Sequence, residues 1–181
     1  FFPMANITSF ECYRCNKVFV PLVPPTVCQK CAGTLYVRYD FSGLNGLSAR
    51  NSIAENSNTD RPWSGMWRYR DVLPTVEPVT LGEGWTPMLP SKRYENVFLK
   101  EEGANPTGTF KARGLSMAIS MLRSYGVKKV AVPSAGNAGG AVAAYAAAAG
   151  MEAHIFMPKD VPLANQVECI AYGRSAERRV G

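Results

Sequence analysis

The second half of the chain alternates between short apolar runs and longer segments with helical periodicity. The apolar runs are 97–100, 129–133 and 153–157, and the helical segments are 110–125, 138–149 and 163–172. Strands that alternate with helices of this length are typical of α/β folds, in which the strands pair in parallel and the helices flank the sheet. The sequence therefore predicts a parallel sheet with flanking helices, and ligands bind such folds at the edge where the strands end.

The helical segment 138–149 carries almost no polar side chain. Such a helix must be covered on most sides, and its small residues permit close packing of helix on sheet. It is preceded by Asn137, which stands on a glycine-bearing loop after the predicted strand 129–133. Backbone N–H groups at a helix start can receive an anion, so this loop is a candidate binding site.

A second candidate loop precedes the helical segment 110–125. It reads Asn-Pro-Thr-Gly-Thr-Phe-Lys from Asn105 to Lys111, and both the Asn-Pro and the Thr-Gly pair favour a turn. Phe110 and the apolar helix face that follows lead us to expect that the helix start is packed down. A partly buried amine loses proton affinity and becomes a usable nucleophile, which makes Lys111 the candidate catalytic residue.

Two nucleotide-binding motifs compete with this interpretation, and both fail. Gly103 and Gly108 have the separation found in a phosphate-binding loop, but Thr109 stands where that motif requires lysine. The glycines at 136–140 lack the spacing of a dinucleotide-binding fingerprint, and no acidic residue ends the next predicted strand.

Four cysteines near the N-terminus form two Cys-x2-Cys pairs that are separated by twelve residues. This spacing is typical of tetrahedral zinc sites, in which the metal folds a unit too small for a core of its own. Disulfides are disfavoured because no secretory signal is recognisable, and a redox pair needs only one Cys-x2-Cys. The sequence therefore predicts a structural Zn²⁺ held by Cys12, Cys15, Cys28 and Cys31, whereas Cys169 and the single histidine, His154, are predicted to be structural.

Four motifs, in order along the chain, resemble those of threonine synthases, which are fold-type II pyridoxal phosphate enzymes. They are Leu81-Gly-Glu-Gly-Trp-Thr-Pro87, Asn105-Pro-Thr-Gly-Thr-Phe-Lys-Ala-Arg-Gly114, Ser134-Ala-Gly-Asn137 and Asp160-Val-Pro-Leu-Ala-Asn165. The wider superfamily shares the lysine and asparagine motifs, whereas the Gly-Glu-Gly turn and the Trp67-Arg-Tyr element favour the synthase. Some threonine synthases also carry a zinc ribbon at the N-terminus.

The resemblance implies a cofactor, a reaction and a set of site residues. Lys111 would hold pyridoxal 5′-phosphate as a Schiff base and then move protons on the substrate, and Asn137 would hydrogen-bond the ring hydroxyl of the cofactor. The residues implied at the substrate carboxylate and the mouth of the site are Thr86, Ser134, Ala135 and Ala138. The implied reaction is that of a lyase in threonine biosynthesis: O-phosphohomoserine loses phosphate, water adds, and threonine leaves.

We expect four segments along the chain. They are a zinc-ribbon-like segment at 10–40, a linker at 41–62, part of the cofactor-binding α/β fold at 63–173 and an irregular tail at 174–181. A fold-type II enzyme places its cofactor between two α/β domains and needs roughly twice this length. We therefore expect an incomplete chain, inactive alone, that lacks the phosphate-binding glycine loop and the partner of the pyridine nitrogen.

Two alternatives stay open. Another fold-type II enzyme, such as a threonine or serine dehydratase or a cysteate synthase-like enzyme, would fit the lysine and asparagine motifs. A non-catalytic zinc-ribbon binding module with an inert α/β segment would fit the cysteines. The sequence of the ribbon shows no interleaved basic and aromatic face, which argues against a nucleic-acid partner.

Charge and hydropathy disfavour a nucleic-acid or membrane partner. The formal net charge is +6, but the basic residues are scattered apart from Arg174, Arg178 and Arg179, which indicates a solvated surface. No apolar run approaches the roughly 20 residues that span a bilayer, and the first residues lack a secretory pattern. We expect a cytoplasmic enzyme with no nucleic-acid or membrane partner, and a homodimer at full length.

Overall fold

The computed structural model describes residues 7–20, 26–43, 46–56, 64–74, 76–172 and 175–180. The chain divides into two compact units. The first comprises residues 1–59 and 68–76, and the second comprises residues 60–67 and 77–181. Within the described residues, no helix combines the length and the apolar character that a membrane crossing requires.

A three-stranded antiparallel sheet forms the framework of the first unit. Its strands are β1 (Ile7–Cys12), β2 (Val18–Phe19) and β3 (Leu35–Tyr39), and their order in the sheet is β2-β1-β3. The register pairs Phe10 with Phe19 and Cys12 with Leu35. Phe10 and Cys12 are buried, so β1 turns one face toward the interior of this small unit.

The segment 41–62 is not a uniform linker, which corrects the prediction from composition. Helix α1 spans Gly46–Asn56 within it. Ser and Asn compete with the backbone for hydrogen bonds, and the segment has no strong apolar stripe, so its pattern resembles that of a loop. Its Ala, Leu, Arg and Glu residues nevertheless have good intrinsic helix propensity.

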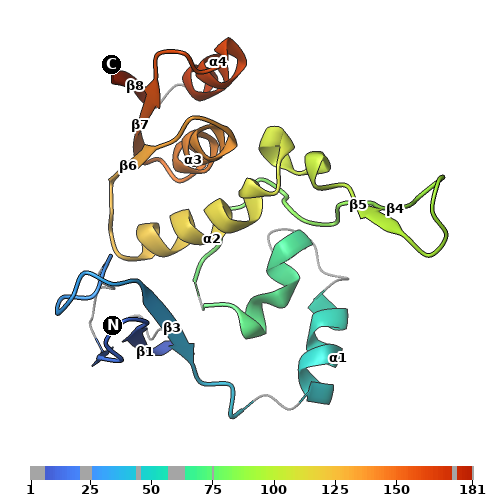
Figure 1. The fold of residues 1–181 in the computed structure, drawn as a ribbon. Helices are drawn as coiled ribbons and strands as arrows, with labels where there is room; N and C mark the ends of the chain where they lie inside the picture. The colour runs from blue at the N-terminus through green and yellow to red at the C-terminus, as the bar shows by residue number, and fades with distance from the viewer. Residues whose placement is uncertain are drawn as a thin grey trace. The chain divides into compact units, whose positions relative to one another are not determined.

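The second unit contains the predicted parallel sheet (Figure 1). Strands β6 (Lys129–Pro133), β7 (Glu152–Pro158) and β8 (Ser175–Val180) lie in the order β6-β7-β8, and the main helices are α2 (Lys111–Ser124), α3 (Asn137–Ala148) and α4 (Leu163–Ala171). Helix α3 connects β6 to β7, and α4 connects β7 to β8. The α/β prediction is confirmed.

Strand β8 corrects the prediction of an irregular tail. It pairs with β7 in parallel, from Ala153 opposite Ser175 to Pro158 opposite Val180. The sequence Ser-Ala-Glu-Arg-Arg-Val lacks the alternation of apolar and polar residues that marks a half-buried strand. Backbone pairing with the edge of β7 supplies order that the side-chain pattern does not predict.

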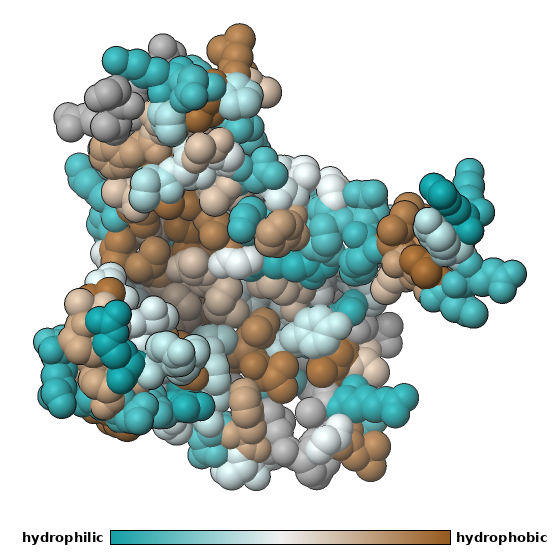
Figure 2. All heavy atoms as spheres, viewed as in Figure 1, coloured by the Kyte–Doolittle hydropathy of each residue, from teal (hydrophilic) through white to brown (hydrophobic). Residues whose placement is uncertain are grey.

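Short elements fill the stretch before α2. They are η1 (Gly65–Val72), β4 (Met88–Pro90), β5 (Phe98–Lys100), η2 (Glu102–Ala104) and η3 (Pro106–Gly108). Strands β4 and β5 form an antiparallel hairpin. Hydrophobic side chains lie on the surface of this hairpin (Figure 2), and the large exposed ones are Met88, Leu89, Phe98 and Leu99.

Helix α3 is the centre of the core, as its apolar sequence predicts. Residues 139–146 are all buried, and the helix contacts α2, α4, β6 and β7. The approach to the sheet is close at Gly139, where an added Cβ would lie 3.0 Å from Cγ2 of Ile155. A small residue is therefore required at this point of the helix.

Candidate active site and metal centre

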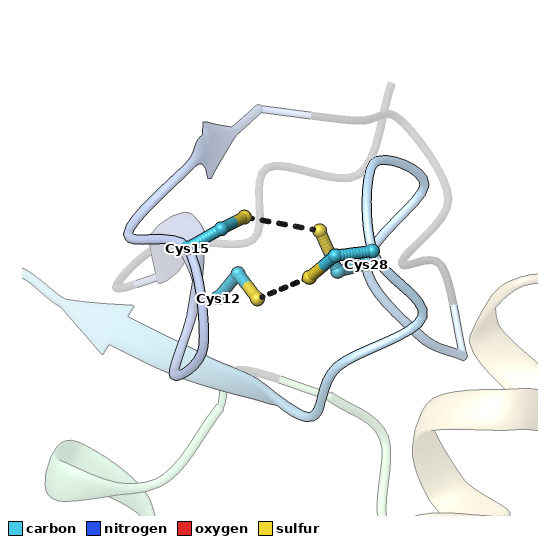
Figure 3. A group of neighbouring side chains, drawn as sticks. Cys12, Cys15 and Cys28 are labelled. Atoms are coloured by element: carbon cyan, nitrogen blue, oxygen red, sulfur yellow. Dashed lines mark hydrogen bonds between the residues drawn. The ribbon is translucent and has the colours of Figure 1, made fainter.

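The four predicted zinc ligands come together in the first unit (Figure 3). All four Sγ atoms lie within 4.8 Å of one another; Sγ of Cys12 lies 3.5 Å from Sγ of Cys31, and Sγ of Cys15 lies 3.7 Å from Sγ of Cys28. A tetrahedral zinc site with bonds of about 2.3 Å separates its sulfur atoms by about 3.8 Å. The donor set and its spacing fit a zinc ion.

The two Cys-x2-Cys pairs share one backbone geometry. The N–H of Asn16 donates to the carbonyl of Cys12 at 2.9 Å, and the N–H of Ala32 donates to the carbonyl of Cys28 at 2.8 Å. Asn16 and Ala32 both have left-handed φ angles, 53° and 54°. This conformation is costly for a residue with a Cβ. Because it occurs in both turns, the arrangement of the four cysteines requires the same backbone conformation in each turn.

Gly33 leaves room for the sulfur atoms. A Cβ at this position would lie 3.1 Å from Sγ of Cys12 and 3.3 Å from Sγ of Cys31. Its carbonyl accepts the N–H of Cys28 at 2.8 Å. The backbone therefore passes directly over the cluster, which a larger residue would obstruct.

One thiol of the cluster is unusually acidic. Burial raises the pKa of Cys12, but hydrogen bonds from the backbone N–H groups of Cys15 and Arg14 and from the thiols of Cys31 and Cys28 outweigh burial and lower the pKa to about 6. Thiolates are the form of cysteine that binds metal. A backbone hydrogen bond lowers the pKa of Cys31, but burial and the neighbouring thiols raise it to about 12, so the thiols share protons as one cluster and Cys12 is the first to ionise.

The surface of the ribbon does combine aromatic and basic side chains. Tyr13 and Tyr36 are exposed and form an edge-to-face pair with ring centroids 6.0 Å apart. Nζ of Lys17 lies 5.3 Å from the ring centroid of Phe19. The absence of a nucleic-acid partner stays a prediction.

Lys111 is the first residue of α2, which begins one residue later than the predicted start at Phe110. Its N–H donates to Oγ1 of the buried Thr109 at 3.2 Å, which fixes the start of the helix. In the turn before it, Thr107 has a φ of 62°, and its buried hydroxyl has no hydrogen-bond partner within the described residues. Buried polar groups in proteins are ordinarily satisfied, so an unpaired hydroxyl beside Lys111 is consistent with a ligand site.

Phe110 does not pack down as expected. It is 57% exposed, and Nζ of Lys111 lies 4.5 Å from the centroid of its ring. Phe110 stands at the N-cap of α2, and the first buried residue of the helix is Ala112, two positions later. The lysine is half-buried and makes no ion pair within the described part of the chain.

The second candidate loop is held in shape by one hydroxyl. Oγ of Ser134 accepts the N–H of Gly139 at 3.0 Å and the N–H of Gly136 at 3.3 Å. Asn137 follows as the first residue of α3, is exposed, and shows no side-chain hydrogen bond within the described residues. The N–H groups of Asn137 and Ala138 belong to the first turn, where no carbonyl of the same helix can accept them. These groups are available for a ligand.

The two loops are neighbours in the second unit. Helix α2 packs on α3, and the turn η3 before Lys111 also contacts α3 (Figure 1). The loop with Asn137 follows the end of β6, and the carbonyl of its Ala135 accepts a hydrogen bond from Asn165 at 3.4 Å. The structure thus brings these three sequence motifs together in the second unit.

Thr86, from the remaining motif, lies in a polar cluster. Its hydroxyl donates to Oε1 of Glu102 at 2.6 Å and accepts from Nη2 of Arg113 at 3.1 Å. Hydrogen bonds from Arg113 first, and then from Thr86 and Asn105, lower the pKa of Glu102 to about 2, against a smaller opposing effect of burial. The cluster anchors the turn with Thr86 to the first turn of α2, and a role of Thr86 toward substrate stays a prediction.

Sequence reasoning did not single out Glu83, Glu102 or Arg113. Glu83 is fully buried, and it stands between Gly82 and Gly84, which both have positive φ angles. A glutamate enclosed by two such glycines is a signal that the chain turns inward there. No comparable local signal marks Glu102 and Arg113, because their pairing joins residues that are eleven positions apart.

Comparison with known proteins assigns the chain to a family. The sequence profile of the family described as "Pyridoxal-phosphate dependent enzyme" matches residues 79–178, which include both candidate loops. The chain belongs to this family. An amine without an ion pair, an uncommitted amide and open N–H groups at a helix start fit such a cofactor.

Several curated relatives of this family member are threonine synthases. That of Methanosarcina acetivorans is 32% identical over 171 residues, which cover 90% of this chain and 40% of that protein. That of Methanocaldococcus jannaschii is 30% identical over 173 residues, which cover 90% and 41%. The chain therefore spans about two fifths of the length of these relatives. The solved structure of maize serine racemase has a TM-score of 0.49 and 26% identity, covering 72% of this chain and 36% of that one.

Proposed function

We propose that the chain is part of a pyridoxal phosphate-dependent threonine synthase, which converts O-phosphohomoserine and water to threonine and phosphate. One observation carries this proposal. The similarity to threonine synthases covers 90% of the chain and therefore runs through the cysteine unit as well as the α/β unit. Residues 79–178 alone indicate only the wider family.

Six residues of the chain have proposed roles at the cofactor and substrate. When bound, pyridoxal phosphate supplies the electron sink that makes carbanion chemistry accessible. Nζ of Lys111 binds the cofactor and later moves protons on the carbon chain of the substrate. The amide of Asn137 bonds the ring hydroxyl, and the loop of Ser134, Ala135 and Ala138 surrounds the substrate carboxylate. The N–H groups of Ala135 and Ala138 are its proposed donors, since the N–H of Ser134 donates to the carbonyl of Phe156 at 2.9 Å. Thr86 lies at the mouth of the same site.

We also propose that a zinc ion occupies the four-cysteine cluster and stabilises the first unit. The sulfur separations and the acidic Cys12 support this. None of the four cysteines lies in the second unit, which carries Lys111 and Asn137. The zinc is therefore structural in this proposal.

The 181-residue chain alone is proposed to be inactive. It spans about two fifths of the relatives' length, and the exposed apolar side chains of the β4–β5 hairpin suit a surface that further polypeptide covers. A site with one wall open to water weakens the electrostatic contacts that stabilise a carbanion. The complete enzyme is proposed to be a cytoplasmic homodimer.

The test uses the full-length gene product that contains this chain. Phosphate release from O-phosphohomoserine and threonine formation are measured for the wild type, for Lys111→Ala and for Lys128→Ala, which alters an exposed lysine outside both loops. We expect equal amounts of phosphate and threonine from the wild type and from Lys128→Ala. Lys111→Ala should lose turnover and the visible absorbance of lysine-bound cofactor.

Other outcomes decide between the alternatives. Ammonia and 2-oxobutanoate formed from threonine, without phosphate release from O-phosphohomoserine, would show a dehydratase. Protein that binds zinc and retains RNA or DNA on a filter, but has no visible cofactor band, would show a binding module. An unchanged cofactor band in Lys111→Ala would assign the cofactor to another lysine.

A further inference from the structure

Glu83 is a fully buried carboxylate that gathers hydrogen bonds from several segments of the second unit. Its donors are Trp67 Nε1 (2.8 Å) and Ser116 Oγ (2.6 Å) to Oε1, and Tyr145 OH (2.6 Å), Leu81 N (3.1 Å) and Thr80 Oγ1 (3.2 Å) to Oε2. The one proton of the Ser116 hydroxyl is shared with the carbonyl of Val79, which lies 2.8 Å away. These donors come from η1, α2, α3 and the turn of Glu83 itself. One side chain therefore joins four parts of the fold.

The charge of Glu83 is not balanced by a cation. None of its donors carries a formal charge, and no ion pair in the described part of the chain includes this residue. A charge without a counter-charge is costly to bury, and apolar residues of the same volume commonly stabilise a fold as well or better. Stability alone is therefore a weak reason for a carboxylate here, whereas fixed geometry is a better one.

The two helices that Glu83 joins are those that begin with the cofactor residues. Ser116 lies five residues after Lys111 on α2, and Tyr145 lies eight residues after Asn137 on α3. At a rise of about 1.5 Å per residue, the two anchors are about 7.5 Å and about 12 Å from the helix starts. We propose that Glu83 is a positioning residue that sets the separation of Lys111 from Asn137. This inference rests on the cofactor roles proposed above.

The donors are suited to this task. Burial first, and then the hydrogen bond and charge of Glu83, raise the pKa of Tyr145, so its phenol stays a donor throughout the working range of pH. Trp67 and Ser116 also hydrogen-bond each other at 3.0 Å. The side chains that surround Glu83 are thus a phenol, an indole and hydroxyls, which are neutral hydrogen-bonding groups.

The chain offers a matched control on the same helix. Ser120 is as buried as Ser116 and lies one turn later on α2, but it binds the N–H of Val79 at 2.7 Å and the carbonyl of Ser116 at 2.6 Å. It has no contact with Glu83 among the hydrogen bonds of the described residues. Ser120→Ala therefore removes a buried hydroxyl at equal depth without touching the carboxylate.

The experiment compares Glu83→Gln, Tyr145→Phe, Ser116→Ala and Ser120→Ala in the full-length protein. Hydrogen exchange is measured on cofactor-free protein at residues 111–116 and 137–142, and cofactor affinity and the pH titration of the visible band are measured on loaded protein. We expect Tyr145→Phe to raise exchange at 137–142, and Ser116→Ala to raise it at 111–116. Each should weaken cofactor binding about tenfold and shift the titration of the band. Ser120→Ala should leave the exchange, the affinity and the titration unchanged.

A double-mutant comparison of cofactor affinity gives the most specific test. In the Glu83→Gln background, Tyr145→Phe should produce little further loss of cofactor affinity, because the shared acceptor is already impaired. If Glu83→Gln does not fold, the test rests on Tyr145→Phe and Ser116→Ala, the two helix variants that each remove a donor to Glu83. The proposal is overturned if both helix variants lower the melting temperature as Ser120→Ala does and leave exchange, affinity and titration unchanged. If the wild type binds no cofactor, the proposed function fails, and exchange at the two helix starts still decides whether Glu83 couples them.

Discussion

Arg113 contacts both carboxylate oxygens of Glu102: its Nε lies 2.7 Å from Oε2, and its Nη2 lies 2.8 Å from Oε1. Two parallel hydrogen bonds of this kind fix the relative orientation of the two groups as well as their distance. Glu102 stands in η2 and Arg113 in the first turn of α2. The ion pair therefore holds the start of the helix that presents Lys111.

This ion pair predicts a pH dependence of stability. The pKa of Glu102 is lowered from 4.5 to about 2, so its contribution is fully present above about pH 4.5 and is lost as the pH falls toward 2. Glu102→Gln should lower the free energy of unfolding on the order of 1 kcal/mol at pH 6, after allowance for partial exposure, and by almost nothing near pH 2. Urea unfolding of the full-length protein between pH 2 and pH 6 measures the difference.

The control for this prediction is Glu95→Gln, which alters an exposed glutamate in the turn of the β4–β5 hairpin. Its free energy of unfolding should follow the wild type across the whole range. A constant offset between wild type and Glu102→Gln, independent of pH, would show that the variant changes packing and not an ionised pair.

The repeating part of the fold could be predicted from sequence because each element buries a recognisable pattern. The apolar strand at 129–133 and the alanine-rich helix that follows it were placed within one residue of their observed ends. Lys111 and Asn137 could be singled out because turn-forming residues place each of them at a helix start. These signals come from neighbouring residues, so they can be recognised in a single sequence.

The rest depended on contacts between distant segments. Strand β8 is ordered by pairing with β7, and the ion pair of Glu102 with Arg113 forms only when η2 meets α2. The burial of Phe110 was predicted wrongly, because this residue is the exposed N-cap of α2 and the buried positions of the helix begin at Ala112. An apolar residue at the end of a helix does not reveal from sequence alone whether it faces the core or solvent.

Removal of one thiol should abolish metal binding. In Cys28→Ser a weaker hydroxyl ligand replaces one of four thiolates that lie within 4.8 Å of one another, and we expect the zinc content to fall from one equivalent to below one tenth at neutral pH in the presence of a competing chelator. Metal analysis of the purified full-length protein measures this.

Cys169→Ala is the matched control, because Cys169 is equally buried but lies in α4, outside the cluster. It should keep one equivalent of zinc while losing some stability through the smaller side chain. Equal zinc in Cys28→Ser and wild type would place the metal elsewhere in the protein.

Asn137→Ala should separate cofactor binding from folding. The side chain is exposed and shows no hydrogen bond within the described residues, so the melting temperature of the cofactor-free protein should change little. The affinity for pyridoxal phosphate should fall about tenfold, the value of one hydrogen bond to a charged oxygen. Absorbance titration measures the affinity, and a drop in melting temperature without a loss of affinity would assign Asn137 a structural role instead.

The turn around Glu83 requires glycine at Gly84, and this requirement is steric as well as conformational. Gly84 has a φ of 104°, and an added Cβ would lie 2.5 Å from the backbone nitrogen of Met66 and 2.8 Å from the carbonyl carbon of Gly65. Backbone atoms cannot move aside as a flexible side chain can. Gly84→Ala should therefore lower the free energy of unfolding by about 3 kcal/mol or more.

Gly126→Ala separates the two causes, because Gly126 has a φ of 75° but no heavy atom within 4 Å of the added Cβ. It incurs the conformational cost alone, and we expect a loss of about 1 kcal/mol. Chemical unfolding of both variants in the full-length protein gives the comparison.

Gly84→Ala should also weaken cofactor binding, because displacement of the turn moves Glu83 away from α2 and α3, whereas Gly126→Ala should bind cofactor as the wild type does. Similar losses of stability in the two variants would mean that the turn at Gly84 yields easily, and that the close approach to Gly65 and Met66 does not fix the position of Glu83.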